Sequence, residues 1–479
     1  MTRRDYPDGV SRYAADAHDL ASYAAAGDQL EHMRTPLLHD SRDRNSKIFY
    51  AYFDGTGNDA ANPRLGDTNV EHLHLATVAA ARRARSIGTF YLSGPGTQDG
   101  PIAATRDAVR GSSYDARLET MYHEFCKQAG QWLRENPDAR ISLANIGFSR
   151  GAEQAAGFAR MVAERGIHDV SQAIVERDEN GLIVRARYPA PPLQAPGQIP
   201  QAELLFDPVG TGVPRQRDRR PPPQVLTALQ ITAEDERRDL FRGSRILDPG
   251  FSHGGRFLNV TVGGCHSDIG GSYREDGLAR RNYNLGVDFL NSLSDQPFLP
   301  KRHLRPDLDV VHRSLEHSRA YDDDHYRANE RRGLPEARRR GQDEVIGGRP
   351  GDRRPEARDA EPIDRALDAR YPRRPVQIGP VPETPMEFRY NPPAQERSDL
   401  QPTAPPRDPL RRTIGLIAEA EVRGDRSQAD AALDAYLDSP RGRAFAAQVD
   451  ARIESLRAAQ PEADRSQESH APRARTLAI

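Results

Sequence analysis

A serine between two glycines is the first candidate for chemistry, because the motif GFSRG places Ser149 between Gly147 and Gly151. An apolar run at 141–148 predicts a strand before the motif, and an alanine-rich pattern predicts a helix after it. This context is typical of a nucleophile elbow, in which a tight turn lifts the serine hydroxyl above the end of a sheet. The backbone N–H of Arg150, at the helix start, would then face a developing oxyanion. The alternative is a glycine-rich turn in which the serine only caps the helix.

A general base and an acid for this serine follow it in the chain. Asp207 comes after the apolar run 203–206, and His266 comes after the run 259–265. The order serine, aspartate, histidine is that of the α/β-hydrolases. In such a triad His266 takes the proton of Ser149 and returns it to the leaving group, while Asp207 orients the imidazole. An aspartate at a strand end is often a turn cap and a single histidine is often structural, but three such residues at three strand ends favour a catalytic set.

Two further acidic residues have expected supporting roles. Asp54 ends the first expected strand, and its loop is the candidate for a second oxyanion donor through the N–H of Gly55 or Thr56. Asp268 lies two residues after His266, where it is better placed to brace the histidine loop than to face the ring nitrogen. We therefore expect both carboxylates to support the site.

A metal-dependent hydrolase is a competing interpretation of the same part of the sequence. It would use four side chains, those of Asp54, Asp59, His266 and Asp268. These residues do not form a compact metal-binding motif on a helix, and this interpretation leaves the serine elbow without a function. We therefore predict neither a metal ion nor another cofactor.

The composition restricts the classes of protein that fit. Lys and Arg number 68 against 70 Asp and Glu, a balance that argues against nucleic-acid binding driven by bulk charge. The two cysteines, Cys126 and Cys265, form neither a disulfide framework nor a zinc-ligand spacing. The N-terminal residues lack the apolar stretch of a signal peptide, and no run approaches the roughly 18 apolar residues that span a bilayer. We therefore expect a soluble protein, cytoplasmic in the cell that makes it, whose export would use a route without a signal peptide.

The 479 residues are enough for two or three domains, and their patterning is uneven. Between 46 and 300, apolar runs alternate with helical patterns, which indicates βαβ units and a mostly parallel sheet with helices on both faces. Besides the strand before the serine, the expected strands are 47–53, 88–94, 203–212 and 256–264. Their carboxyl ends carry the candidate residues, and ligands bind at that edge of open α/β sheets. The predicted fold class is therefore α/β, of the α/β-hydrolase type.

The remainder of the chain is expected to lie outside this catalytic domain. We expect a helical or irregular lead-in at 1–45 and a helical extension at 301–329. Residues 330–409 are rich in Arg and Pro and lack apolar periodicity, which predicts a disordered linker. Residues 410–460 regain helical spacing and are expected to form a small helical module, followed by a disordered tail at 461–479.

Several motifs together resemble a known family. They are FDGT at 53–56, GPGT at 94–97, GFSRGA at 147–152, FDPVG at 206–210, EDERR with Phe241 at 234–241, and GCHSDIGG at 264–271. In this order they look like the α/β-hydrolase domain of type VI secretion lipase effectors, family 1, over about 46–295. The resemblance implies a bacterial phospholipase that cleaves acyl esters of glycerophospholipids and is delivered into rival cells. It also implies Ser149 as the nucleophile, Asp207 as the acid and His266 as the base.

Two features depart from the family pattern. Pro208 follows Asp207 where the family usually has threonine, and the helix after the elbow is less aromatic. The first change concerns how the acid loop is held and removes no catalytic group. The partners implied are a phospholipid or membrane surface, the secretion machinery and an immunity protein, with no nucleic acid. Arginines between 215 and 220 could contact anionic headgroups, although a solvated loop explains them equally well.

Two other functional classes fit the sequence. The chain could be a non-catalytic binding or adaptor protein on a retained hydrolase scaffold, which predicts no reaction with a fluorophosphonate probe. It could also be an esterase for soluble esters or polysaccharide acetates, which a comparison of vesicles with soluble esters would separate from a phospholipase.

Overall fold

The computed structural model describes residues 6–55, 67–95, 113–178, 180–210, 213–235, 243–314, 344–345 and 362–384. The chain divides into two compact units, 1–402 and 403–479, and all the described residues belong to the first. The expected helical module at 410–460 and the tail at 461–479 therefore lie outside the described residues. Within the described part, no helix has both the length and the hydropathy needed to cross a bilayer.

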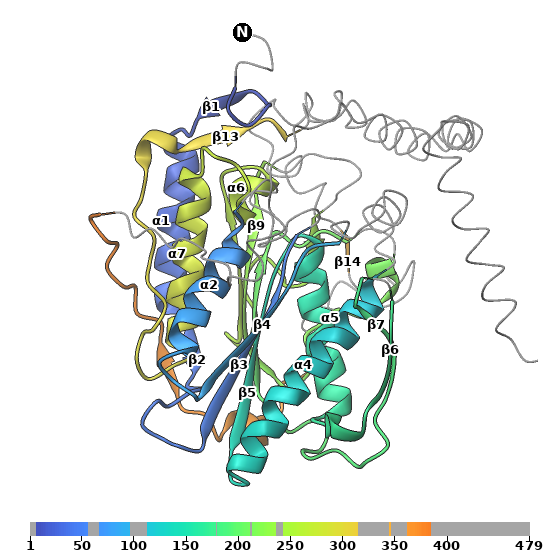
Figure 1. The fold of residues 1–479 in the computed structure, drawn as a ribbon. Helices are drawn as coiled ribbons and strands as arrows, with labels where there is room; N and C mark the ends of the chain where they lie inside the picture. Colours follow the sequence, from blue (N-terminus) through green and yellow to red (C-terminus); the bar gives the residue numbers. More distant parts are fainter. Residues whose placement is uncertain are drawn as a thin grey trace, which may run out of the picture. The chain divides into compact units, whose positions relative to one another are not determined.

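A seven-stranded sheet forms the centre of the first unit (Figure 1). Its order is β11-β12-β9-β8-β5-β3-β4, and every neighbouring pair is parallel except β11 with β12. The strands are β3 (Ser46–Phe53), β4 (Ile87–Leu92), β5 (Arg140–Phe148), β8 (Gln201–Phe206), β9 (Val225–Ala233), β11 (Gly250–Phe251) and β12 (Phe257–Val262). The elbow serine follows β5, an interior strand that lies between β8 and β3.

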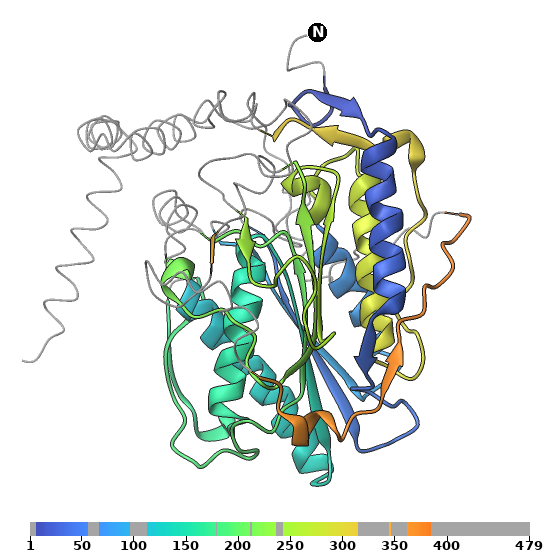
Figure 2. The ribbon, with the colours of Figure 1, turned by 180° about the vertical axis from the view of Figure 1, so that it is seen from behind.

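Helices cover both faces of the sheet (Figures 1 and 2). One face carries α1 (Ala17–His32), α2 (Asn69–Ala81) and α7 (Gly277–Ser292), and the other carries α4 (Tyr114–Glu135) and α5 (Arg150–Arg165). Each face has its own hydrophobic core, so neighbouring residues of β8 alternate between them, with Leu204 in one and Leu205 in the other. Burial on both faces explains why these strands are continuous apolar runs. The fold is α/β-hydrolase-like, as predicted.

Shorter elements fasten loops and distant segments to this core. The small strand pairs are β1 (Arg12–Ala14) with β13 (Val310–His312), β2 (Arg34–Pro36) with β15 (Arg373–Pro375), β6 (Ile174–Arg177) with β7 (Ile183–Arg187), and β10 (Ser244–Arg245) with β14 (Glu344–Val345). The short helices are α6 (His266–Gly270), α10 (Arg365–Asp368) and the 3-10 turns η2 (Val170–Gln172), η3 (Val213–Gln216) and η5 (Pro306–Leu308).

β9 is a strand that was not predicted from the sequence. Its run VLTALQITA mixes polar with apolar residues, although all nine residues are buried. Gln230 bonds to Thr232 and to the carbonyl of Ser244, and Thr232 donates to Asn259 at 2.8 Å. These partners satisfy the polar side chains inside the protein. The strand character of β9 therefore depends on residues that lie later in the chain.

Two predictions about the regions beyond the catalytic domain are wrong where the structure describes them. The expected helical extension at 301–329 contains the short turn η5 and the strand β13 in its described part, because β13 pairs with β1. The expected disordered linker at 330–409 is ordered at 362–384, where Leu367 and Val376 are buried and β15 pairs with β2. Both strands pair with residues near the N-terminus, which local composition does not reveal. The lead-in is likewise part of the core, since α1 packs against β12.

One carboxyl group in the centre of the sheet lacks a hydrogen-bond partner among the described residues. Glu203 lies on β8, between Asn145 and Ala228 of the neighbouring strands, and is fully buried. Neither of its carboxyl oxygens has a hydrogen-bond partner in the described part of the chain. Burial raises the pKa of Glu203 to about 8, although the charges of Arg256 and Arg160 oppose the shift.

We expect Glu203→Gln to stabilise the fold at pH 8. Below pH 4.5 both the folded and the unfolded state hold the proton, so Glu203 adds no pH dependence there. Between pH 4.5 and about 8 only the unfolded state ionises, so the free energy of unfolding falls by about 1.4 kcal/mol per pH unit. Chemical denaturation at several pH values measures this slope, which the Gln variant should lose. The exposed Glu164→Gln is the control, and equal slopes in wild type and Glu203→Gln would contradict the prediction.

Candidate active site

Ser149 occupies a strained turn between β5 and α5. Its backbone has φ 58° and ψ −126°, a positive φ that residues other than glycine rarely adopt. The N–H of Ser149 donates to the carbonyl of Phe206 at 3.0 Å, and the N–H of Val209 donates to the carbonyl of Ser149 at 3.3 Å. These bonds hold the turn against the end of β8. Ser149 therefore lies at the carboxyl edge of the sheet, in the kind of turn that a nucleophile elbow requires.

Close backbone approaches require both glycines of the motif. A Cβ at Gly147 would lie 2.3 Å from the carbonyl oxygen of Gly151. A Cβ at Gly151 would lie 2.1 Å from the carbonyl oxygen of Phe53 and 2.5 Å from that of Asp54. Both contacts are too short for real atoms and involve backbone, which cannot move aside easily. The first turn of α5, which begins at Arg150, therefore packs directly against the end of β3.

Asp207 and His266 form a buried pair at the same edge of the sheet. Nδ1 of His266 donates to Oδ2 of Asp207 at 2.6 Å, and both side chains are more than nine-tenths buried. Asp207 has a φ of 36°, and its other oxygen accepts the N–H of Ala233 at 3.0 Å. The carboxylate is thus held by β9, the strand between β8 and β12. With Nδ1 on the carboxylate, Nε2 of His266 is the ring nitrogen that can act as a base.

Phe148 connects the serine turn to the histidine helix. Its ring centroid lies 4.6 Å from that of the His266 imidazole, with 33° between the planes. A Cβ at Gly270, in α6, would lie 2.1 Å from the same ring. Ser149 follows Phe148 directly, and the exposed fractions of Ser149 and His266 are each 6%. The structure therefore brings the serine, the aspartate and the histidine to one buried edge.

The loop after β3 is held by the fully buried carboxylate of Asp54. Its Oδ1 accepts the N–H of Gly55 at 2.6 Å, and its Oδ2 accepts the hydroxyls of Thr68 at 2.8 Å and Tyr91 at 2.7 Å. The bond to Asp54 occupies the N–H of Gly55, so the structure does not offer Gly55 as the second oxyanion donor. Thr56, the other candidate in this loop, lies outside the described residues.

The start of α2 joins this loop to the histidine helix. Thr68 caps α2 by accepting the N–H of Glu71 at 3.0 Å, and it pairs with Gly271 in an isolated β-bridge. The amide of Asn69 donates to the carbonyl of Ile269, in α6, at 2.9 Å. Movement of α6 would therefore disturb the loop after β3 as well.

Asp268 braces the helix that begins with His266. Its Oδ2 accepts the N–H of Cys265 at 2.9 Å and the N–H of His312 at 3.0 Å, and its Oδ1 lies 2.6 Å from Nδ1 of His312. Nε2 of His312 lies 3.3 Å from a carboxylate oxygen of Asp8. His312 was not predicted from the sequence, because nothing in the short run VVH distinguishes it from a structural histidine. Its contacts make it a positioning residue for α6.

The charge on His312 follows from its surroundings. Burial opposes protonation, but the attraction of Asp268 and hydrogen bonds to Asp268 and Asp8 outweigh it and raise the pKa of His312 to about 9. Glu275 lies close to this group and pairs with Arg12 of β1. The N-terminal segment, β13 and the loop after α6 thus share one charged cluster.

Two sets of side chains in the described part of the chain come close enough to share a cation. They are Asp8, Glu275 and His312, and Asp19, Glu234 and Asp235. Neither set contains Asp54, His266 or Asp268, and Asp59 lies outside the described residues. The carboxylates of Asp54 and Asp268 accept hydrogen bonds from the protein itself. Among the described residues, Asp54, His266 and Asp268 are therefore not brought together as one ligand set.

The arginines considered as headgroup contacts are engaged within the protein. Arg217 and Arg220 each pair with an aspartate. Arg219 pairs with Glu153 of α5, and both side chains of this pair are fully buried. Taking these charges to a membrane would break the ion pairs, at a high cost for the buried one. Arg217 thus pairs with α4, Arg219 with α5 and Arg220 within its own loop, so these arginines do not form a free basic surface.

We expect His312→Ala to destabilise the fold at pH 7 by about 3 kcal/mol, because it leaves the buried carboxylate of Asp268 without its ion-pair partner. The pKa of His312 rises from 6.5 to about 9 on folding, so its stabilising contribution is complete below pH 6.5 and is lost as the pH rises through 9. Denaturation between pH 6 and about 10 should show this slope in wild type and not in the variant.

A second readout separates positioning from general stability. In protein that remains folded, His312→Ala should slow the labelling of Ser149 by a fluorophosphonate, because the brace on the helix of His266 is lost. The exposed His253→Ala is the matched control. Wild-type labelling and a wild-type pH slope in His312→Ala would both contradict the positioning role.

A family comparison covers the part of the chain that contains the elbow. The model described as T6SS, phospholipase effector Tle1-like, catalytic domain matches residues 47–178. These residues extend from β3 through β6 and include Ser149. No curated protein matches the chain.

Solved structures show more distant similarity. An uncharacterized protein from Pseudomonas aeruginosa has 15% identity and a TM-score of 0.35, over 67% of this chain and 55% of that one. A Tle1 effector bound to the VgrG spike of the type 6 secretion system has 19% identity and a TM-score of 0.28, over 47% and 51%. The apo form of Thermogutta terrifontis esterase 2 has 11% identity and a TM-score of 0.25, over 60% and 95%.

The chain thus spans about half the length of the first two structures. Because all three TM-scores are below 0.5, the fold assignment rests on the strand order described above. The family match begins at the first strand of the predicted domain. Residues 47–178 match the catalytic domain of the Tle1-like phospholipase effectors, which confirms the resemblance predicted from the motifs.

Proposed function

We propose that this chain is a serine hydrolase that cleaves the acyl esters of phospholipids through an acyl-enzyme. The observation that carries the proposal is the elbow turn of Ser149 at the same sheet edge as the Asp207–His266 pair. The family match at 47–178 supports a phospholipid ester as the substrate class.

The first half of the reaction follows from the proton positions. Nε2 of His266 takes the proton of Ser149 as Oγ attacks the ester carbonyl, and Asp207 on Nδ1 holds the tautomer and stabilises the imidazolium. The carbonyl oxygen becomes an oxyanion, for which the N–H of Arg150 at the start of α5 is the proposed donor. When the C–O bond to the alcohol breaks, the departing lysophospholipid takes the proton from His266 and the acyl group stays on Ser149.

The second half repeats the proton transfer with water. His266 takes a proton from a water molecule that attacks the acyl-serine, and Ser149 regains its proton as the fatty acid leaves. Burial of the Asp207–His266 pair strengthens the attraction between the carboxylate and the imidazolium, because little water screens it. Asp54 and Asp268 have positioning roles in this proposal, since each holds a loop that carries part of the site.

The proposed setting is competition between bacteria. The family match supports delivery by a type VI secretion machinery, with the protein cytoplasmic in its producer and active in a target cell. The proposed partners are therefore that machinery, an immunity protein that protects the producer, and a phospholipid surface. Nucleic acid is not among them.

Ser149→Ala should lower the release of fatty acid from phosphatidylglycerol or phosphatidylethanolamine vesicles by about 10⁴-fold or more, because the nucleophile is lost. Asp207→Asn should lower kcat by about 10⁴-fold, because the imidazole loses its orienting carboxylate. The exposed Ser171→Ala is the matched control and should retain activity. Circular dichroism establishes that each variant is folded.

The possible outcomes separate the competing functions. Wild-type turnover in Ser149→Ala would exclude this serine as the nucleophile. A folded wild-type protein that reacts with no fluorophosphonate would instead indicate a non-catalytic scaffold. Faster cleavage of soluble esters than of vesicles would indicate an esterase for soluble substrates.

A further inference from the structure

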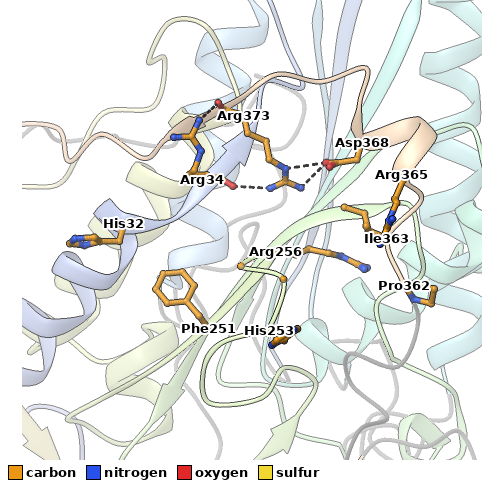
Figure 3. Close-up of a pocket in the computed structure, with 12 residues that line it drawn as sticks. His32, Arg34, Phe251, His253, Arg256, Pro362, Ile363, Arg365, Asp368 and Arg373 are labelled. Carbon is orange, nitrogen blue, oxygen red and sulfur yellow. Dashed lines mark hydrogen bonds and ion pairs between the residues drawn. The ribbon is translucent and has the colours of Figure 1, made fainter.

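A second group of charged residues lies at the amino ends of the parallel strands, whereas Ser149 lies at their carboxyl ends. A hollow of about 720 Å³ lies there between the end of α1, the turn before β12 and the segment 362–373 (Figure 3). Its lining includes four arginines, Arg34, Arg256, Arg365 and Arg373, and a single carboxylate, Asp368. Four positive charges and one negative charge give this lining a formal charge of +3 with neutral histidines, whereas the whole chain carries −2. Gathering like charges around one hollow is unfavourable unless an anion compensates them.

Backbone contacts fix two of the arginines in advance. Arg256 is buried, donates to two backbone carbonyls beside the start of β9, and lies over the ring of Phe257 at 4.2 Å. Arg373 donates to backbone carbonyls in β2 and β9 and pairs with Asp368. These side chains therefore lose little conformational freedom when a ligand binds, which is the condition for a preorganised site.

The other two arginines are exposed at the rim. Arg34 comes from β2 and Arg365 from α10, and neither has an acidic partner among the residues that the structure describes. Figure 3 shows Phe251 and Pro362 on different sides of the Arg256 side chain, so apolar surface borders the charged floor. Phe251 is 40% exposed, so its ring contributes apolar surface to this rim.

We propose that this hollow is a binding site for an organic phosphate monoester. The planar guanidinium group matches pairs of phosphate oxygens, and a monoester carries close to two negative charges at neutral pH. The volume exceeds what an inorganic phosphate ion needs, and the apolar rim suits the organic part of the ligand. The ligand could be a soluble molecule such as glycerol 3-phosphate or the headgroup of a phosphatidate lipid. The site does not depend on the proposed esterase activity, because none of its residues lies at the catalytic edge.

The test measures binding in the Ser149→Ala protein, so that no lipid is hydrolysed. Calorimetry with glycerol 3-phosphate tests the soluble source, and sedimentation with phosphatidate-containing phosphatidylcholine vesicles tests the lipid source. The double variant Arg34→Gln, Arg365→Gln removes the two rim charges, which are exposed and need not affect folding. It should weaken binding by about tenfold or more, as expected for loss of charge-assisted hydrogen bonds. The control is Arg82→Gln, Arg83→Gln, which removes two exposed charges before β4, the outer strand on the side of the sheet away from β11 and β12.

Each outcome decides the proposal. Selective weakening of glycerol 3-phosphate binding supports a soluble ligand, and selective weakening of vesicle binding alone supports a lipid headgroup. Absence of binding to both probes overturns the proposal, as does equal weakening in the rim variant and the control variant. Because every arm uses Ser149→Ala, a failure of the proposed hydrolase function leaves these results unaffected.

Discussion

The candidate active site depends on how closely the first turn of α5 approaches the end of β3. A Cβ at Gly151 would lie 2.1 Å from the carbonyl oxygen of Phe53, so only glycine allows the helix to begin there. The position of α5 in turn sets the positive φ of Ser149, and the bond from Ser149 to the carbonyl of Phe206 ties the turn to β8. Asp54 holds the other side of the approach through Thr68 and Tyr91. One backbone contact thus brings the ends of three parallel strands together, and the acid follows the last of them.

The histidine side of the site is held by a network of charged side chains in addition to the backbone bridge at Gly271. The carboxylate of Asp268 accepts bonds from Cys265, at the start of α6, and from His312. His312 also approaches Asp8, which is 304 residues away in the chain. Buried charges are costly unless they are paired, so this cluster is stable only as a complete set. The segments before and after the predicted catalytic domain therefore contribute to the position of His266.

The near-neutral composition hides an uneven distribution of charge. At the catalytic edge the described arginines of the 215–220 loop are neutralised, most completely in the buried pair of Arg219 with Glu153. At the amino ends of the strands, four arginines and one carboxylate line a hollow. Glu203, which is buried between these two regions and has no hydrogen-bond partner among the described residues, is neutral at pH 7 because burial raises the pKa of Glu203 to about 8. The net charge of the chain therefore does not predict where an anion would bind, whereas the positions of individual arginines do.

The sequence by itself determined the parallel sheet and the candidates Ser149, Asp207 and His266, because apolar runs and glycine turns are local signals that survive without knowledge of the fold. It did not reveal β9, β13 or β15, whose polar or short segments become strands only when distant partners bury and pair them. The sequence also did not reveal that Asp54 accepts the N–H of Gly55. This bond depends on the orientation of the Asp54 carboxylate, which Thr68 and Tyr91 hold. The sequence assigned the brace on the histidine loop to Asp268, and only the tertiary structure added His312 and Asp8 to it and formed the arginine-lined hollow. Both join residues hundreds of positions apart, and such contacts follow from packing in space rather than from any pattern along the chain.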